Sequence, residues 1–218
     1  MLAKALRILP EAFFAGIFIG LAGTVYLCTA NPVTGSFLFG FGLLTIVCFQ
    51  LKLYTGAIGY LVEKGNKFYS YLGDLFWIWL GNLAGCFTVG YAIRHTRMYN
   101  VIDEKVLSIV NTKILDDPVS ILILAIFCGM LMFTAVDAFK NEKLPAPCRP
   151  VMVFLCVMVF ILSGFEHCIA NMYYFSAADL WNPQTLLLTL LMTLGNSIGG
   201  NAFAALVKLS PRLVEQVK

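Results

Sequence analysis

The chain has 218 residues, of which 60% are hydrophobic and 12% are charged, with a formal net charge of +3. Soluble domains carry about 25% charged residues, so this chain has too few charges to cover a water-soluble surface. The small net charge and the absence of a basic cluster also argue against nucleic acid as a partner. We therefore expect a single membrane-embedded domain over residues 1–218, with the lipid bilayer as its surroundings.

Six apolar stretches are each long enough to cross a bilayer core of about 30 Å as a helix. Turn residues such as Pro32, Gly65 and Pro183 lie between them. The spans are expected at residues 11–30, 37–62, 71–93, 119–139, 150–175 and 185–207. They are too long and continuous for barrel strands, so the predicted fold class is an all-α membrane protein with six transmembrane helices.

Lysine and arginine are unevenly distributed between the two sides of this arrangement. Only Arg94, Arg97, Lys105 and Lys113 fall on one side, in the linker 94–118. By the positive-inside rule, the richer side is cytoplasmic, so both termini are predicted in the cytoplasm and the linker outside the cell membrane. The richer side holds Lys4, Arg7, Lys64, Lys67, Lys140, Lys143, Arg149, Lys208, Arg212 and Lys218.

A weak internal repeat relates the two halves of the chain. Leu-Gly-Asn-Leu-Ala-Gly at 80–85 resembles Leu-Gly-Asn-Ser-Ile-Gly at 194–199, and polar interruptions fall at 52–56 and 164–171 in the second and fifth spans. Each half has three spans, an odd number, so the second half (about 119–207) is inverted relative to the first (about 11–93). Inverted repeats with broken helices are typical of transporters and channels, whose substrate path lies at the repeat interface.

The repeated glycines predict close packing between helices. Asn82 and Asn196, which lie within the same motifs, are expected to bind backbone groups of neighbouring helices.

The break in the fifth span contains Glu166, His167 and Asn171 within an apolar stretch. A charge there costs about 2.5–3.5 kcal/mol even on lenient scales, so such residues usually face a cavity or the bundle interior. His167 is interpreted as a pathway residue that polarises, or gives a proton to, a small anion; the alternative is a packed histidine bonded within the bundle. Glu166 is expected to cap freed backbone donors or to pair across a subunit contact.

The break in the second span contains Lys52 and Thr55. The Thr55 hydroxyl is placed to donate to His167 or to a passing anion, unless it is only a turn residue. Lys52 is a second buried charge that pairs with an acid, extends toward water, or attracts anions. Asp74 and Asp137 are its nearest acidic candidates by topology.

The seven cysteines and two histidines do not suggest a metal or cofactor site. No Cys-x-x-Cys motif occurs, and two histidines are too few for a histidine-rich metal centre. We interpret the cysteines as small buried hydrophobic residues. Six of them lie in apolar stretches and one, Cys148, in a polar loop; the six are Cys28, Cys48, Cys86, Cys128, Cys156 and Cys168.

The segment Ser-Gly-Phe-Glu-His-Cys-Ile-Ala-Asn-Met at 163–172 resembles the signature of the formate/nitrite transporter family. The resemblance extends to Leu-Tyr-Thr-Gly at 53–56, to Gly-Asn-Leu-Ala-Gly at 81–85 and to Gly-Asn-Ser-Ile-Gly-Gly at 195–200. It implies a homopentamer of aquaporin-like protomers, each with its own pore. It also implies transport of small monovalent anions of weak acids: formate, nitrite, hydrosulfide, acetate or lactate.

The resemblance also implies roles for individual residues. His167 matches the central pore histidine, Thr55 its hydroxyl partner and Glu166 the neighbouring glutamate. Lys113 resembles a vestibule lysine that attracts anions. Four apolar residues match two hydrophobic constrictions of the family. Phe39 and Phe160 match one, and Leu43 and Leu53 match the other.

Two positions depart from the family pattern. Lys52 stands where many members have an acid, and Gly129 stands where a pore asparagine is common. These departures leave the identity of the anion open.

Other functions compete with anion transport. A neutral-solute channel like the aquaglyceroporins is the alternative within transport, although paired Asn-Pro-Ala motifs are absent. An intramembrane enzyme with His167 and Glu166 as acid and base lacks a nucleophile motif and a cofactor fingerprint, so we expect no enzyme. A purely structural scaffold would leave the buried charges unexplained.

Overall fold

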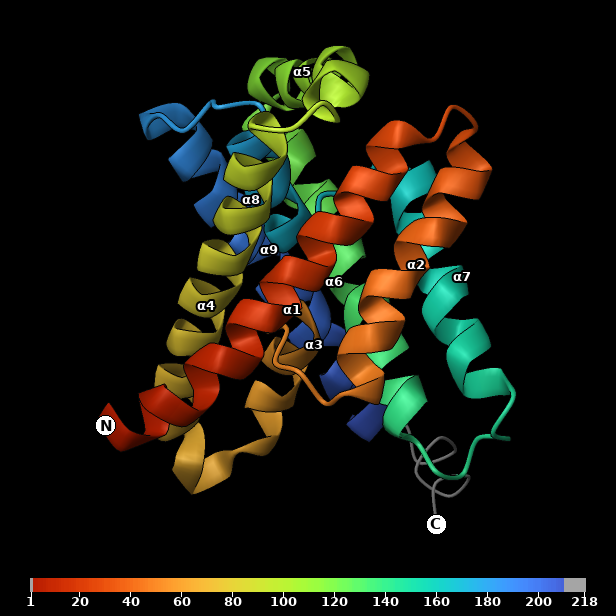
Figure 1. The fold of residues 1–218 in the computed structure, drawn as a ribbon. Helices are drawn as coiled ribbons and strands as arrows, with labels where there is room; N and C mark the ends of the chain where they lie inside the picture. Colours follow the sequence, from red (N-terminus) through yellow and green to blue (C-terminus); the bar gives the residue numbers. More distant parts are fainter. Residues whose placement is uncertain (1, 210–218) are drawn as a thin grey trace.

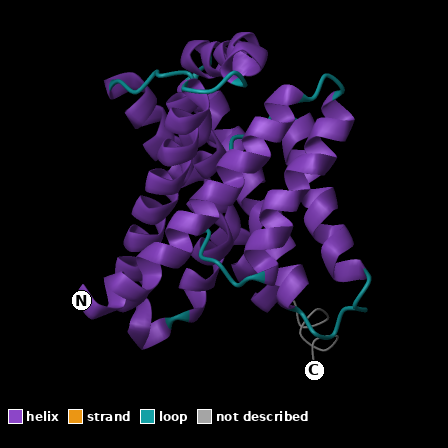
Figure 2. Cartoon of the chain, viewed as in Figure 1, coloured by secondary structure: helices purple, strands orange, loops and turns teal. Residues whose placement is uncertain are grey.

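The computed structural model describes residues 2–209, with side chains described for residues 4–207. Helices connected by short loops make up this part of the chain, which contains no strand (Figure 2). Of the ten residues counted on the cytoplasmic side, Lys208 has no described side chain, and Arg212 and Lys218 lie outside the described residues.

Four helices are long and apolar enough to cross a membrane, and two expected spans are interrupted, as predicted. The second span is divided by residues 49–53 and the fifth by residues 163–167. The elements are α1 (Leu2–Cys28), α2 (Pro32–Cys48), α3 (Tyr54–Ala57), η1 (Ile58–Glu63), η2 (Gly65–Lys67), α4 (Phe68–Arg94), α5 (Tyr99–Leu115), α6 (Pro118–Lys140), α7 (Cys148–Leu162), α8 (Cys168–Ala177) and α9 (Pro183–Leu209).

The two halves are inverted relative to each other. In Figure 1, α1 starts and α9 ends at the lower face, whereas α5 lies across the upper face and leads into α6 from there. Within each half the packing is equivalent, because α1 packs against α2 and α4 as α6 packs against α7 and α9. Trp79 Nε1 donates to Thr193 Oγ1 over 3.0 Å, and these residues are 114 positions apart, the same offset as the repeated motifs. Trp79 and Thr193 are therefore equivalent positions of the two halves, and their contact lies at the pseudo-symmetry axis that relates the halves.

The linker 94–118, for which the sequence predicted no helix, contains the helix α5. Ile102, Val106 and Val110 recur every fourth residue and are fully buried, so they attach one face of α5 to the bundle. Lys105 adds a polar anchor, since its ammonium donates to the carbonyls of Tyr26 and Thr29 at 2.8 Å at the end of α1. Burial lowers the pKa of Lys105 below its usual value.

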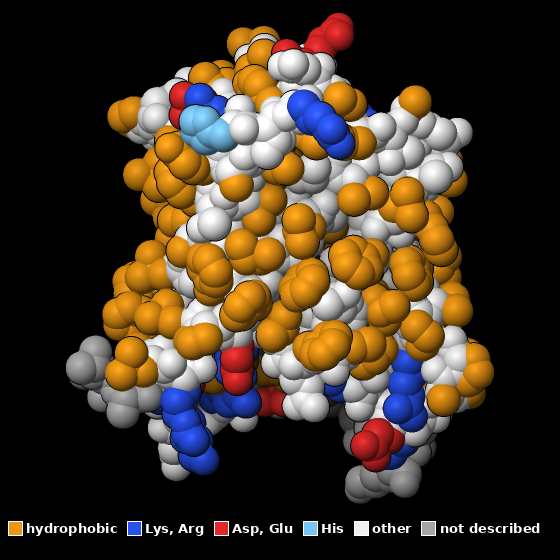
Figure 3. Space-filling view, in the orientation of Figure 1, with side chains coloured by type: hydrophobic (Ala, Val, Ile, Leu, Met, Phe, Trp, Pro, Cys, Tyr) orange, Lys and Arg blue, Asp and Glu red, His pale blue; other side chains and the backbone are white. Residues whose placement is uncertain are grey.

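The surface has the distribution of polarity that a bilayer requires. Hydrophobic side chains cover the middle of the face in Figure 3, whereas charged side chains gather toward its two ends. Large apolar side chains such as Phe14, Phe37 and Leu187 are about half exposed or more. Such an apolar belt is stable in lipid and would be unstable in water.

Glycines allow the long helices of each half to touch. A Cβ at Gly85 would meet the carbonyl oxygen of Phe13, and a Cβ at Gly199 would meet the equivalent oxygen of Ile126. The close packing predicted from the two Gly-x-x-x-Gly motifs is confirmed, since backbone lies against backbone at both crossings.

Replacing Gly199 with Ala should destabilise the protein by about 1–3 kcal/mol, because the added methyl group meets backbone that cannot move aside. Gly73→Ala is the matched control: Gly73 also lies in a helix, but a Cβ there meets no atom within 4 Å. The melting temperature in mild detergent should fall for Gly199→Ala and should stay or rise for Gly73→Ala. Equal melting temperatures for both variants would contradict the packing described here.

Candidate functional site

Two asparagines hold the interrupted backbone at the centre of the bundle. Asn82 Nδ2 donates to the carbonyls of Ala12 at 2.7 Å and Lys52 at 2.9 Å. Its Oδ1 accepts the N–H of Tyr54 at 2.9 Å, the first residue of α3. One buried amide thus satisfies backbone groups on both sides of the break, as a bilayer interior requires.

Asn196 does the same for the second break. Its Nδ2 donates to the carbonyls of Ala125 at 2.7 Å and Glu166 at 2.8 Å, and its Oδ1 accepts the N–H of Cys168 at 2.9 Å. The prediction that both asparagines bind backbone across helices is confirmed. In each break, one residue lies between the carbonyl and the N–H that the asparagine binds. This residue is Leu53 in the first break and His167 in the second.

His167 is held at both ring nitrogens. Nδ1 accepts the backbone N–H of Ala170 at 3.0 Å, which makes the ring the N-terminal cap of α8. Nε2 lies 3.0 Å from Thr55 Oγ1 on α3. His167 is 2% exposed and Thr55 is fully buried, so the two breaks meet in a dry contact between ring and hydroxyl.

Apolar side chains surround this contact. The rings of Phe39 and Phe160 meet edge to face with centroids 5.7 Å apart, and the Phe160 ring lies 5.5 Å from the His167 ring. Leu43, one helical turn from Phe39 on α2, is 1% exposed, and Leu53 is 3% exposed. The structure therefore places both expected constrictions in the same core as His167 and Thr55.

Glu166 forms a buried network with two other residues that sequence analysis selected. Its carboxylate accepts both hydrogen bonds from the Lys113 ammonium, at 2.8 and 2.7 Å, and one from Asn171 Nδ2 at 2.7 Å. The side chains of Lys113 and Glu166 are 13% and 5% exposed. Lys113 is thus a paired cation, and Glu166 pairs within its own chain. Asn171 Oδ1 has no hydrogen-bond partner among the described residues.

Lys52 pairs with a different acid from the two expected. Its ammonium lies 2.9 Å from Glu11 on α1. Asp74 instead binds Lys4 at 2.6 Å, and Asp137 accepts a hydrogen bond from the Tyr60 hydroxyl at 3.1 Å, so the expectation of Asp74 or Asp137 was wrong. Topology could not select Glu11, because helix crossing, not sequence distance, brings α1 beside the break.

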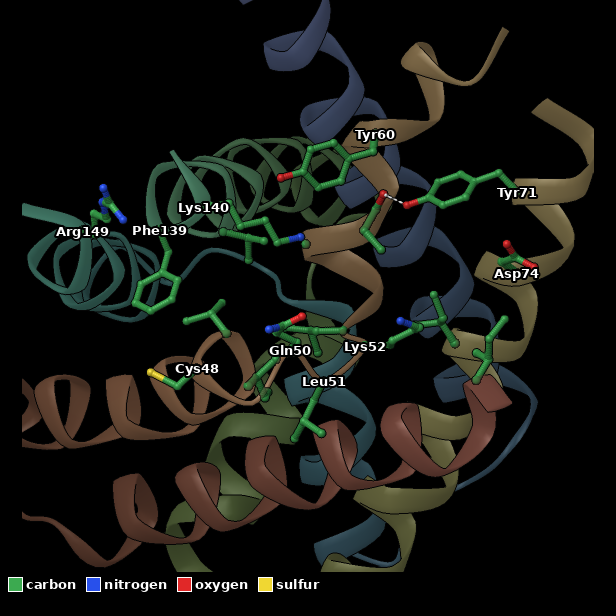
Figure 4. A pocket seen from close by; sticks show the side chains of 18 of the residues that line it. Cys48, Gln50, Leu51, Lys52, Tyr60, Tyr71, Asp74, Phe139, Lys140 and Arg149 are labelled. Carbon is green, nitrogen blue, oxygen red and sulfur yellow. Dashed lines mark hydrogen bonds between the residues drawn. The ribbon is translucent and has the colours of Figure 1, made fainter. Parts of the chain in front are cut away.

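A cavity of about 650 Å³ opens beside Lys52, on the face where α1 begins. Figure 4 shows Lys52, Lys140 and Gln50 around the opening, with Tyr60 and Tyr71 above and Arg149 to one side. Leu53 also lines this cavity, and Thr55, two residues further along the chain, contacts His167. Tyr60, Tyr71, Lys140 and Arg149 were not predicted as site residues, because they come from four different elements and share no motif. Lys140 and Arg149 contributed only to the predicted orientation in the membrane.

Gly129 is a packing residue in this structure. A Cβ at this position would meet the backbone of Asn196, as a Cβ at the equivalent Gly16 would meet that of Asn82. The chain therefore has no room for a side chain at the position where the family pattern has an asparagine.

The cysteines are all free, but not all are buried. Cys86, Cys128, Cys156 and Cys168 are buried as expected. Cys28 and Cys48 are exposed, contrary to expectation, because each is the last residue of its helix. Cys148 is also exposed.

The comparisons with known proteins all lead to the same family. The formate/nitrite transporter family model matches residues 2–210. The chain is 27% identical to the formate-nitrite transporter of Plasmodium falciparum, with 89% of this chain and 74% of that protein aligned. It is 26% identical to the nitrite transporter NirC of Escherichia coli, with 88% and 78% aligned.

Solved structures share the fold. A pentameric formate channel with formate bound superposes with a TM-score of 0.81 at 23% identity, over 94% of this chain and 96% of that one. An ion channel of the same family gives a TM-score of 0.80 at 22% identity, over 93% and 89%. Since the family model matches almost the whole sequence, the chain belongs to the formate/nitrite transporter family and is a membrane transport protein, not an enzyme.

Proposed function

We propose that the chain is a selective pore for small monovalent anions of weak acids. Formate and nitrite are the first candidates, followed by hydrosulfide, acetate and lactate. The observation that carries the proposal is the contact of His167 with Thr55, a pair of polar groups enclosed by apolar side chains. The names of the relatives, a formate-nitrite transporter and a nitrite transporter, support the same substrate class.

The hydrogen bonds of His167 support one of the two modes of action for the ring. Because Ala170 N–H donates to Nδ1, the neutral ring carries its proton on Nε2 and presents that N–H toward Thr55. If Nδ1 also carried a proton, its N–H would face the N–H of Ala170, and the hydrogen bond between them would be lost. Between the two mechanisms left open by the sequence, we therefore favour a hydrogen bond to the anion over proton transfer from a histidinium ring.

The apolar constrictions then determine which solutes pass. A hydrated ion cannot shed its water between Phe39 and Phe160, or between Leu43 and Leu53, without a large free-energy cost. The anion of a weak acid reduces that cost in two ways. It accepts hydrogen bonds from Nε2–H and the Thr55 hydroxyl, and it can pass apolar positions as the neutral acid after taking a proton from a hydronium ion of the adjoining solution. The positive end of the ten-residue helix α8 also favours a partial negative charge beside His167.

In this proposal, a network supports the pore beside His167. It consists of Lys113, Glu166 and Asn171. The ion pair is neutral overall, and the Glu166 carbonyl is one of the groups that Asn196 holds. Removal of either partner would leave an uncompensated buried charge next to His167. Their proposed role is to fix the break beside the pore and to receive the anion on the α5 side.

We propose a homopentamer in the cell membrane with both termini in the cytoplasm. The lysines and arginines of the loops support the orientation. A pentameric formate channel with the same fold supports the assembly. A neutral-solute channel is the alternative within transport, because a ring that only donates a hydrogen bond would serve a neutral solute as well as an anion.

Purified protein in liposomes should transport formate and nitrite, and more slowly acetate, lactate and hydrosulfide, with faster flux at the lower of two pH values. Chloride, the anion of a strong acid, should show little flux at either pH. A pore that passes chloride or glycerol as readily as formate would contradict the proposal.

His167→Phe should lower formate flux by at least about tenfold, because the permeating anion loses a buried hydrogen-bond donor worth about 1.5–3 kcal/mol. Thr55→Val should lower it less, since the ring nitrogen remains. Size-exclusion elution must match the unmodified protein for both variants. Unchanged flux in a correctly assembled His167→Phe variant would identify a packed histidine instead.

Lys52→Glu places two carboxylates together, so formate flux should fall, and most strongly at low ionic strength. The double variant Lys52→Glu with Glu11→Lys restores the pair with reversed direction and separates two explanations. If flux recovers in the double variant, the pair is structural. If flux stays low and the loss shrinks with added salt, the Lys52 charge itself acts on the anion.

Native mass spectrometry from mild detergent should give five copies of the chain. A protein that is active in liposomes after reconstitution as a monomer would contradict the pentamer but would leave the pore within each protomer intact.

A further inference from the structure

We propose that the cavity beside Lys52 is a binding site for organic monocarboxylates too large to pass the constrictions, and that such anions block the pore from the face where α1 begins. The cavity volume of about 650 Å³ lies within the roughly 300–1,000 Å³ of typical small-molecule sites. Formate or nitrite would occupy a small part of it. The space therefore fits a ligand larger than the proposed permeant anions.

The charges around the cavity favour an anion. Lys52, Lys140 and Arg149 line it, together with the acids Asp74 and Glu142. Asp74 is already neutralised by Lys4 at 2.6 Å. Lys52 is paired in the same way with Glu11, so these two outside partners cancel each other. The lining side chains, three cations and two acids, keep a net positive charge that a bound carboxylate would offset.

The three cations are not equally available. Arg149 uses its guanidinium on the carbonyls of Leu144 at 3.1 Å and Glu142 at 2.8 Å, and Lys52 shares its charge with Glu11. Lys140 forms no ion pair with any described residue. Its ammonium lies 4.8 Å from the centre of the Tyr60 ring, and the nearby Asp137 carboxylate accepts a hydrogen bond from the Tyr60 hydroxyl instead. Lys140 is accordingly the principal partner of the carboxylate, with Lys52 second.

The remaining wall is apolar and aromatic. Ile46, Ile78, Val136 and Phe139 line the cavity, and the Tyr71 hydroxyl donates to the carbonyl of Ala57 at 2.8 Å. Inorganic anions such as sulfate would gain nothing from these surfaces. A hydrocarbon or aryl group of several carbons would bury against them while its carboxylate reaches Lys140.

The position of the cavity makes binding inhibitory. Leu53 belongs both to the cavity wall and to the constriction proposed for Leu43 and Leu53, and it is 3% exposed. Thr55, two residues along the chain from Leu53, is also buried and contacts the buried ring of His167. A phenyl ring cannot follow formate past these side chains, so a bound aryl carboxylate closes the route between the cavity and His167.

Calorimetric titration of the purified protein tests the site without reference to transport. 3-Phenylpropionate should bind, whereas 3-phenylpropan-1-ol, with the same body and no charge, and acetate, with the charge and no body, should bind at least about tenfold more weakly. Equal binding of acid and alcohol would show detergent or apolar partition and would overturn the proposal.

Lys140→Gln should weaken 3-phenylpropionate binding by about tenfold, and Lys140→Arg should restore it. Lys143→Gln is the matched control, because Lys143 is exposed on the same face and does not line the cavity. Equal losses in Lys140→Gln and Lys143→Gln would indicate nonspecific attraction and would overturn the proposal, as would no loss in Lys140→Gln.

Inhibition of formate flux by 3-phenylpropionate rests on the proposed function, and binding does not. If 3-phenylpropionate binding depends on Lys140 but the protein shows no formate flux, formate is refuted as the permeant anion. The proposed binding site stands in that case. Formate flux that 3-phenylpropionate does not reduce at saturation, from either side of the liposome, would refute block.

Discussion

Backbone groups cannot be left without hydrogen-bond partners inside a bilayer, and the two interruptions at 49–53 and 163–167 create such groups. Asn82 and Asn196 satisfy them, each with one amide that binds a neighbouring helix and both sides of a break. The glycines around these asparagines let the helices approach close enough for the bonds to form. The ring of His167, the hydroxyl of Thr55 and the wall of the cavity all take their places from this arrangement.

The two breaks have equivalent backbones and different chemistry. Lys52 and Glu166 occupy equivalent positions with opposite charges, and each is paired with an oppositely charged residue, Glu11 or Lys113. The pair at Glu166 is buried, whereas Lys52 and Glu11 are 40% and 47% exposed. One pair is therefore part of the core, and the other lies at the edge of the cavity that Lys52 lines.

Periodic and local features of the sequence predicted much of this structure. Apolar length located the spans, and repeated Gly and Asn residues indicated both the inversion and the backbone contacts of Asn82 and Asn196. Features that depend on helix crossing were not predictable: Glu11 as the partner of Lys52, Lys113 as the partner of Glu166, and the cavity residues Lys140 and Tyr60. The helix α5 was not predicted, although Ile102, Val106 and Val110 recur every fourth residue. The charged and polar residues between them are also typical of an exposed loop.

The bond from Ala170 N–H to His167 Nδ1 joins the imidazole to the first turn of α8. A half-turn of the ring about its bond to Cβ would bring carbon atoms to both positions now occupied by nitrogens, and would lose this bond and the contact with Thr55 together. The ring is therefore fixed to its helix as part of one rigid body. Any displacement of α8 carries the N–H donor with it, and unwinding of its first turn releases the donor altogether.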